Sequence, residues 1–260
     1  MVRMRTDRRT EKEYWDDRWD KIQLPAIHEP TTRHPVAREI LRVFRDCLPQ
    51  GDLSVVEIGG APGRHCAYLS KYHGYRPSII EYSEIGCRKT RENFDLLGLD
   101  VTIHQRDFFS DLSDLPRFDV VMSFGFIEHF DDVPDVLGRH VQLLRPGGIL
   151  ILGVPNFRGI SRKVLAWQAP EMLARHNLEA MDLRNWAVLE DKYGLTPLFK
   201  GYIGGFQPKD LKRCERRTPM RLLVRWFFKM LQSVLAPFPF LRRWNSPSWS
   251  AYLLGIYRLP

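Results

Sequence analysis

Three carboxylates in the first half of the chain each close a short apolar run. They are Glu57, Glu81 and Asp107. A carboxylate can accept two hydrogen bonds at once, which suits a pair of ligand hydroxyls or an amino group. Apolar runs of this length are typical of strands buried on both faces. The three side chains are therefore candidates for binding different parts of one ligand at strand ends.

Glycines follow directly after the first of these carboxylates. Residues 55–64 read Val-Val-Glu-Ile-Gly-Gly-Ala-Pro-Gly-Arg, which predicts a buried strand that turns sharply into a helix. Gly59, Gly60 and Gly63 suit such a turn because glycine accepts positive φ and lets a ligand approach the backbone. We expect a nucleotide-like ligand across this turn. A glycine-rich turn that binds nothing is the alternative.

Strand and helix patterns alternate from residue 52 onward, which predicts a doubly wound α/β fold around a parallel sheet. Pro49 to Asp52 form the turn that leads into the first strand. The predicted strands cover residues 55–58, 77–82, 101–105, 118–124 and 149–154. Predicted helices follow the glycine turn as far as Tyr72, and then cover residues 85–97 and 135–144.

Short motifs accompany these elements in a definite order. They are Glu57 to Gly63, Glu81, Asp107-Phe108, Phe118 to Val121, Glu128-His129-Phe130 and Leu144 to Gly148. This order resembles the class I S-adenosylmethionine (SAM)-dependent methyltransferases, in particular the branch that includes small-molecule O-methyltransferases. Ala61 departs from that family's middle glycine, and it also departs from the dinucleotide-binding fingerprint.

The resemblance covers residues 52–156 and implies a Rossmann-like sheet of seven strands with the last strand antiparallel. Residues 202–206 and 251–257 are the expected sixth and seventh strands. We therefore divide the chain into four parts. They are an N-terminal helical cap (1–49), a SAM-binding core (50–206), a basic and apolar helical insertion (207–250) and the final strand of the core (251–260).

SAM is the cofactor that the resemblance implies. The expected cofactor-binding residues are Glu57, Gly59, Gly60, Gly63, Glu81, Tyr82, Asp107, Phe108 and Phe124. Glu81 would accept from both ribose hydroxyls, and Glu57 would face the amino-acid end of the cofactor. Asp107 would accept from the adenine amino group beside the apolar wall of Phe108, and Phe124 would flank the methionine portion.

Two histidines are candidates for removing the proton of a methyl acceptor. His129 follows the fourth predicted strand, and His176 begins a stretch expected over the same mouth. A neutral imidazole suits removal of a hydroxyl proton near pH 7, although either ring could have a purely structural role. Ubiquinone-biosynthesis-like relatives carry a further glutamate where this chain has Gly125. The sequence therefore does not predict a metal ion.

An N-terminal helix is predicted from Thr10 to Ile22, with Thr10 and Glu13 as a capping box. The spacing of Trp15 and Trp19 places both indoles on one face. Either the helix docks on the core by these rings, or it forms a lid over a ligand.

Composition indicates a soluble, cytoplasmic protein. Hydrophobic residues make up 44% of the 260 residues and charged residues 27%, which is ordinary for a globular protein. The four cysteines form no Cys-x-x-Cys pair, so neither a zinc site nor a disulfide framework is predicted. The N-terminal residues lead into charge rather than an apolar segment, which argues against a secretory signal.

The net charge of +8 comes from one segment, because residues 209–243 hold ten basic and two acidic residues. Within it, residues 218–237 predict a very apolar helix with a cation every fourth residue, at Arg221, Arg225 and Lys229. This helix either packs on the protein's own sheet or lies on an anionic membrane face, which would make the protein peripheral at the inner membrane. The acceptor is expected to be a small molecule, a glycan or a lipid-linked compound.

Two other functions remain open. Methylation of RNA or DNA would explain the basic charge, but residues 123–126 read Ser-Phe-Gly-Phe where amino-methylating enzymes carry Asn/Asp-Pro-Pro-Tyr/Phe. Nucleic acid is therefore not the expected partner. A non-catalytic, membrane-associated module that binds SAM would share the fold, and only turnover would distinguish it from an enzyme.

Overall fold

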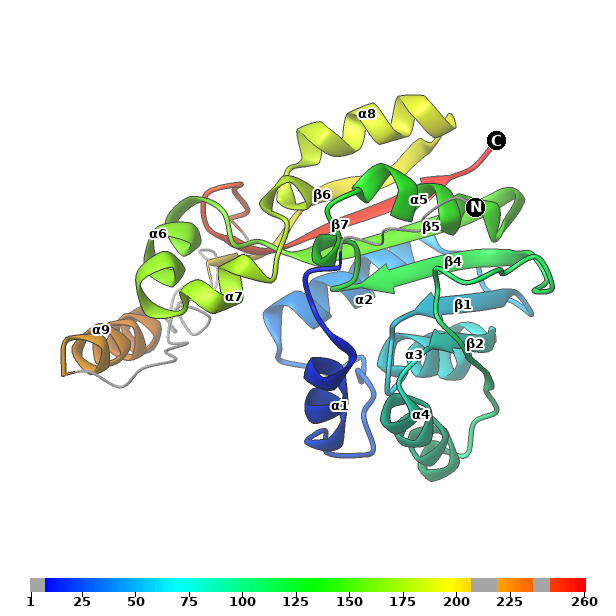
Figure 1. Cartoon of the computed structure of the whole chain (residues 1–260), viewed down its shortest axis with the longest axis horizontal. Helices are drawn as coiled ribbons and strands as arrows, with labels where there is room; N and C mark the ends of the chain where they lie inside the picture. Colours follow the sequence, from blue (N-terminus) through cyan, green and yellow to red (C-terminus); the bar gives the residue numbers. More distant parts are fainter. Residues whose placement is uncertain (1–7, 207–218, 236–243) are drawn as a thin grey trace.

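The computed structural model describes residues 8–206, 219–235 and 244–260 (Figure 1). Seven strands form a single sheet with the order β3-β2-β1-β4-β5-β7-β6. Their bounds are β1 Ser54–Ile58, β2 Arg76–Glu81, β3 Thr102–Gln105, β4 Phe118–Phe124, β5 Leu144–Pro155, β6 Thr196–Phe206 and β7 Ser250–Arg258. Strands β1 to β5 are parallel, and β7 runs antiparallel to both β5 and β6. The predicted seven-stranded sheet with an antiparallel last strand is confirmed.

Both faces of the sheet are buried, which explains the continuous apolar runs in its strands. In β4, Val120 and Met122 point into one core, and Val121 points into the other. The neighbouring β5 divides in the same way, with Ile151 in the first core and Leu150 in the second. Because successive side chains point to opposite faces of the sheet, each of these strands contributes to two separate hydrophobic layers.

Helices cover both faces of this sheet, as Figure 1 shows. On one face lie α2 Pro35–Cys47, α3 Arg64–His73 and α4 Glu84–Leu97. The other face carries α5 Val133–Gln142, α6 Gly159–Gln168, α7 Pro170–Ala174, the 3-10 turn η2 Leu178–Met181 and α8 Leu183–Tyr193. The arrangement is the doubly wound fold that the alternating pattern predicts.

The chain changes direction across the sheet between β1 and β4. It proceeds from β1 to β2 and β3 on one side, and then crosses to β4 and β5 on the other. In open α/β sheets a ligand binds beyond the carboxyl ends of the strands at such a switch point. A 3-10 turn, η1 Ile127–His129, follows β4 at this position.

The N-terminal helix α1 spans Lys12–Asp20 and packs beside α4. The predicted capping box is wrong, because the helix begins two residues later and its N-cap, Glu11, makes no side-chain capping bond. Thr10 instead accepts a hydrogen bond from the indole Nε1 of Trp15 at 3.1 Å. This bond fixes the residues before α1 against the helix itself.

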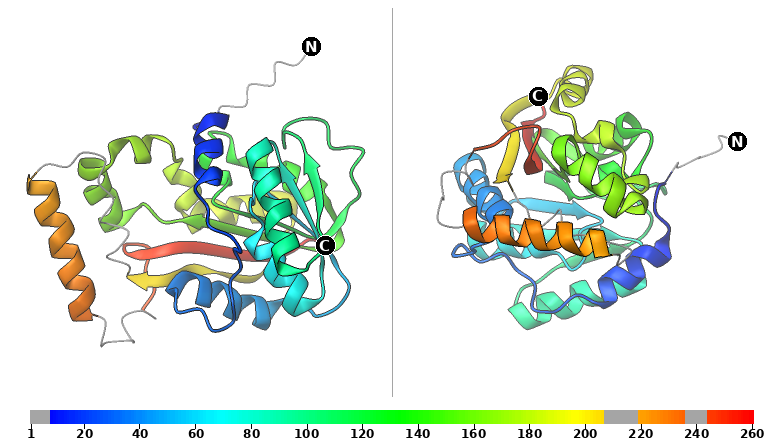
Figure 2. Two further views of the ribbon diagram at one scale, coloured as in Figure 1. Left: turned by 90° about the horizontal axis from the view of Figure 1, so that it is seen from below. Right: turned by 90° about the vertical axis from the view of Figure 1, so that its left-hand side faces the viewer.

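The last helix, α9 Pro219–Leu235, stands apart at one end of the molecule (Figures 1 and 2). Its bounds agree with the helix predicted in the insertion, although residues 207–218 and 236–243 of that insertion lie outside the described residues. Among the helices that the structure describes, none is long and apolar enough to cross a membrane.

Candidate active site

The turn from β1 into α3 depends on glycines for steric reasons. Gly59 has φ +62°, and a Cβ there would lie 2.6 Å from Cδ2 of Phe126. Gly63 has φ +81° and is the N-cap residue of α3. A side chain at either position would be strained, and at Gly59 it would also collide with the aromatic wall of the site. The backbone can therefore pass close to a ligand here.

The buried side chain of Glu57 stabilises this turn through contacts with the start of α3. It is 1% exposed, accepts the backbone N–H of Cys66 at 3.3 Å, and lies 3.0 Å from Nδ1 of His65. The carboxylate thus caps the N-terminal end of α3, where it also complements the helix dipole. A Cβ at Gly60 would lie 2.3 Å from Cγ of Glu57, so this glycine is required for the cap. The predicted contact of Glu57 with a cofactor stays a prediction.

Glu81 ends β2 and faces the site from the neighbouring strand. It is 2% exposed, and one of its oxygens accepts the backbone N–H of Ser83 at 2.8 Å. Burial raises the pKa of Glu81 to about 7, with a smaller contribution from Asp16, although backbone N–H groups lower it in part. This carboxylate is poised to change its charge near neutral pH when a ligand supplies further donors.

Asp107 and Phe108 follow β3, the edge strand that pairs with β2. Asp107 accepts the backbone N–H of Phe109 at 2.9 Å and forms an ion pair with Arg8. Phe108 is 4% exposed and stands edge-on to Phe126, with ring centroids 5.5 Å apart. The predicted acceptor and the predicted apolar wall thus lie side by side, but the acceptor is paired with an N-terminal cation that the sequence analysis did not single out.

These strand ends surround one cavity at the switch point. Its lining includes five of the predicted cofactor-binding residues and one predicted catalytic residue, namely Gly59, Glu81, Tyr82, Asp107, Phe108 and His129. The other predicted residues lie outside this lining; they are Glu57, Gly60, Gly63, Phe124 and His176. Phe124, for example, stacks on His65 with ring centroids 3.8 Å apart.

The N-terminal segment closes this cavity, and we call residues 8–20 the lid. Arg8, Thr10, Trp15 and Trp19 belong to the lining. The backbone N–H of Arg9 donates to the carbonyl of His129 at 2.8 Å, which joins the lid to the turn after β4. The closed cavity has a volume of about 40 Å³, whereas small-molecule sites usually measure about 300 to 1,000 Å³. With the lid in this position, the cavity is too small to enclose a nucleoside-sized ligand.

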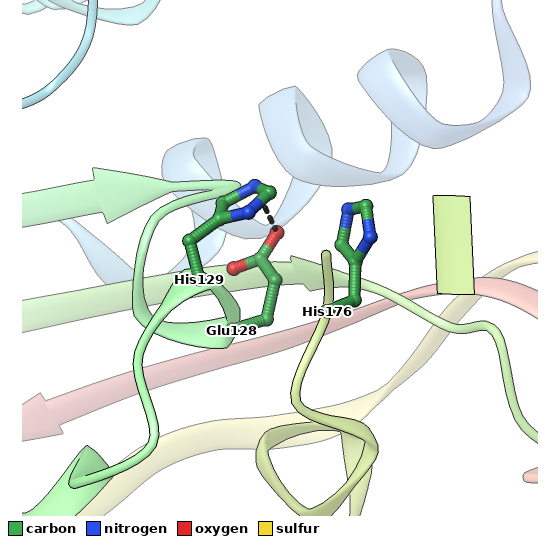
Figure 3. A group of neighbouring side chains, drawn as sticks. All are labelled: Glu128, His129 and His176. Atoms are coloured by element: carbon green, nitrogen blue, oxygen red, sulfur yellow. Dashed lines mark ion pairs between the residues drawn. The ribbon is translucent and has the colours of Figure 1, made fainter. Parts of the chain in front are cut away.

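The two predicted catalytic histidines lie next to each other (Figure 3). The ring centroids of His129 and His176 are 4.5 Å apart. Nδ1 of His129 lies 2.9 Å from the carbonyl of Arg175, and Nδ1 of His176 lies 2.5 Å from the carbonyl of Met172. A carbonyl only accepts, so Nδ1 is the protonated nitrogen in each ring and the lone pair is on Nε2.

Glu128 completes this group, although the sequence analysis did not select it as a catalytic residue. It is 1% exposed, and its Oε1 lies 3.9 Å from Nε2 of His129. Its other oxygen is buried and has no hydrogen-bond partner among the described residues. Burial raises the pKa of Glu128 to about 8. Burial and then His176 lower the pKa of His129 to about 3.

The same three side chains have the donor atoms of a metal site. One ligand atom from each of Glu128, His129 and His176 lies within 4.8 Å of the others. Backbone carbonyls hold both imidazoles by Nδ1, which is how metal-binding histidines are commonly oriented. The group could therefore hold a divalent cation, although the sequence predicts none.

The residues that sequence reasoning missed come from the lid and from the centre of a motif. Arg8 had no local signal, because its partner Asp107 is 99 residues away in the chain. The spacing of Trp15 and Trp19 in the sequence was compatible with a lid, but it did not identify the site that the lid would cover. Glu128 stood in the Glu-His pair, but only the structure shows that it is buried and that its Oε2 has no hydrogen-bond partner among the described residues.

Comparisons of the sequence and of the structure with known proteins both find methyltransferases. Residues 29–199 match a family model described as a methyltransferase domain. A ubiquinone biosynthesis O-methyltransferase from Rhodopseudomonas palustris (strain BisB5) is 26% identical over 155 residues, which are 57% of this chain and 59% of that protein. The chain thus spans about three fifths of the length of the curated relatives it matches.

Solved structures share the fold at low sequence identity. A SAM-dependent methyltransferase from Thiobacillus denitrificans, in complex with S-adenosyl-L-homocysteine, superposes with a TM-score of 0.57 at 18% identity, covering 90% of this chain and 94% of that one. The N-methyltransferase NodS from Bradyrhizobium japonicum WM9, also in complex with S-adenosyl-L-homocysteine, has a TM-score of 0.57 at 16% identity, covering 96% of this chain and 100% of that one.

Proposed function

The chain belongs to the methyltransferase-domain family, and from this premise we propose that it transfers the methyl group of SAM to a hydroxyl group of a small-molecule, glycan or lipid-linked acceptor. One observation carries the proposal. The carboxylates of Glu81 and Asp107, at the ends of adjacent strands, line the same cavity as the imidazole of His129. A polar cofactor site and a base for the acceptor therefore meet in one place.

The cofactor side of the cavity matches the donors of SAM. Glu81 would take both ribose hydroxyls, because its buried carboxylate has acceptor capacity beyond its backbone bonds. Asp107 would take the adenine amino group once the lid moves and Arg8 releases it. Gly59 would allow the amino-acid portion to approach the backbone of the glycine turn. NodS and the Thiobacillus enzyme, whose structures contain the demethylated product, support this choice of cofactor.

The acceptor side needs positioning and a proton acceptor. SAM supplies an activated methyl group, so the protein has to orient the acceptor in line and remove its proton. Nε2 of His129 carries a lone pair, because Nδ1 donates to the carbonyl of Arg175. We assign the base role to His129, with His176 as the alternative.

His129 would be a weak base on its own, since its pKa is lowered to about 3. Glu128 offsets this weakness, because its carboxylate lies 3.9 Å from Nε2 and its charge would stabilise the imidazolium. The pKa of Glu128 is raised to about 8, so the two groups would titrate as one coupled pair. The acceptor proton would pass to this pair rather than to an isolated imidazole.

The Rhodopseudomonas relative supports an acceptor that is methylated on oxygen, because it is named for ubiquinone biosynthesis and O-methylation. Aromatic rings in the cavity lining suit an apolar or aromatic acceptor; they are Trp15, Trp19, Phe109, Phe126 and Phe130. We place the activity in the cytoplasm, and the free thiols of Cys47, Cys66 and Cys87 suit a reducing compartment.

Calorimetry and a transfer assay test this proposal. We expect SAM and S-adenosylhomocysteine to bind and NAD not to bind. Glu81→Ala should weaken SAM binding by about 1.5–3 kcal/mol, the range for hydrogen bonds to a charged group. Labelled SAM, incubated with extracts from the protein's own source, should yield a labelled compound that carries a methyl ether. NAD binding without SAM binding would overturn the cofactor assignment, and SAM binding without any turnover would leave a non-catalytic SAM-binding module.

A further inference from the structure

Helix α9 has an amphipathic sequence. Large apolar residues recur at intervals of three and four along it, which places them on one face; they are Met220, Leu223, Trp226, Phe227, Met230 and Val234. In the sequence, Arg221, Arg225 and Lys229 recur every fourth residue on the other side of the helix. Residues 216–260 contain eight basic residues and no acidic residue. The helix thus combines a wide apolar face with a cationic one.

The apolar face of α9 points to solvent rather than into the protein. Leu223 is 59% exposed, Trp226 57% and Phe227 56%. Phe228 is the only buried side chain among the described residues of α9. A helix packed on its own sheet would bury its apolar face and expose its cations, so that interpretation of the sequence does not fit.

The position of α9 explains why none of the described residues covers its apolar face. Figure 2 shows the helix at one end of the molecule, away from the sheet. It lies at the end toward which β1 and β4 run, beyond α6 and α7 (Figure 1). His176 lies two residues after the end of α7, so α9, beyond α7, lies toward the same end as the acceptor side of the cavity. An exposed apolar patch of this kind marks a binding surface on a stable protein.

The charge pattern identifies the kind of partner. A spanning helix is excluded for α9, which has 17 residues and three cations in its sequence. An interfacial helix needs aromatic and aliphatic residues on one face and Lys or Arg on the other, which is the composition of α9. Lys and Arg have long flexible stems, so cations on the polar face of such a helix can reach the anionic headgroups.

We propose that α9 docks on the surface of an anionic lipid bilayer, with its exposed apolar face in the headgroup layer. The cations then lie above anionic headgroups, and Trp226 lies at the boundary between headgroups and acyl chains, where indoles are favoured. This inference goes beyond the proposed function and stands without it, because docking requires neither SAM nor an acceptor. It also brings the acceptor side of the cavity to the membrane.

Vesicle sedimentation of the whole chain tests this docking. We expect binding to vesicles of phosphatidylcholine mixed with phosphatidylglycerol, weaker binding to phosphatidylcholine alone, and loss of binding in high salt. Trp226→Ser together with Phe227→Ser should lower partitioning by at least about 100-fold, because each aromatic side chain removed from water contributes about tenfold or more. Replacing Arg221, Arg225 and Lys229 by Gln should lower it on the order of 100-fold, about fivefold for each cation.

Matched controls separate docking from a general effect of mutation. Leu96→Ser with Val188→Ser removes exposed apolar side chains at 58% and 67% exposure on other helices, and should leave partitioning unchanged. The replaced side chains of Trp226 and Phe227 are exposed, so circular dichroism should show all variants folded. The proposal would be overturned if the wild type did not bind anionic vesicles. It would also be overturned if Leu96→Ser with Val188→Ser lowered partitioning as much as Trp226→Ser with Phe227→Ser. A concentration-dependent dimer that Trp226→Ser with Phe227→Ser dissociates would assign the face to a second copy of the chain instead.

Discussion

The indole of Trp15 stands edge-on to the imidazole of His129, with ring centroids 5.0 Å apart. One ring belongs to the lid and the other to the turn after β4, so this contact joins the N-terminal segment to the proposed base. Trp15 also donates to Thr10 through Nε1. The ring contact of Trp15 and the backbone bond of Arg9 therefore hold the lid against the proposed base.

Opening of the lid should limit cofactor entry. Trp15→Ala removes an aromatic contact and a hydrogen bond that each contribute about 0.5–1.5 kcal/mol. We expect faster amide hydrogen exchange in residues 8–20 of the free protein and SAM association about tenfold faster by surface plasmon resonance. Trp226→Ala, on the exposed face of α9, is the matched control and should change neither rate. An unchanged association rate in Trp15→Ala would show that the lid is not the gate.

The affinity for SAM should rise with pH through the titration of Glu81. Its pKa is about 7 in the closed protein, and the ribose hydroxyls would donate to the charged form. Binding must therefore release a proton below pH 7, and affinity should increase about 10-fold or more from pH 5.5 to pH 7.5. The amino group of SAM titrates as well, so Glu81→Gln serves as the control in calorimetry. Identical pH dependence in Glu81→Gln and the wild type would separate Glu81 from the cofactor.

Loss of the proposed base should reduce turnover without affecting cofactor affinity. His129→Ala should lower turnover by a factor on the order of 10² to 10⁴ and leave SAM binding intact. Because Glu128 must be ionised to stabilise the imidazolium, turnover should increase with pH toward about 8 rather than near 6.5, and Glu128→Gln should remove this dependence. His104→Gln, on the edge strand β3, is the histidine control. Full turnover in His129→Ala would move the role to His176.

Much of the fold followed from local patterns, because strands buried on both faces need continuous apolar residues. The parallel register then brings Glu81 and Asp107 together at one edge, as their positions at strand ends predict. The pairing of Arg8 with Asp107 has no local pattern, since it depends on how a distant segment folds back. The apolar face of α9 was ambiguous for the same reason, because its sequence is the same whether or not another element covers it.

Chelation should leave turnover intact, whereas added zinc should inhibit it. The proposed base needs the lone pair on Nε2 of His129, and Zn²⁺ would occupy that lone pair together with His176 and Glu128. We expect turnover to be unchanged in EDTA and to fall with Zn²⁺. His176→Ala should weaken the inhibition because it removes one ligand. Activity that EDTA abolishes and a divalent cation restores would make this group a functional metal site.

Glu128 should reduce the stability of the protein as pH rises. Its pKa is about 8 in the folded state against 4.5 for an ordinary glutamate, so the folded state binds the proton more tightly than the unfolded state does. The free energy of unfolding therefore falls as pH rises from about 4.5 to about 8, by up to about 5 kcal/mol in total. Glu128→Gln cannot ionise, so urea unfolding should show it to be more stable than the wild type above pH 8 but not at pH 5. The exposed Glu92→Gln is the control, and its stability should follow the wild type at every pH. A constant difference between Glu128→Gln and the wild type from pH 5 to pH 9 would mean that this carboxylate does not titrate in that range.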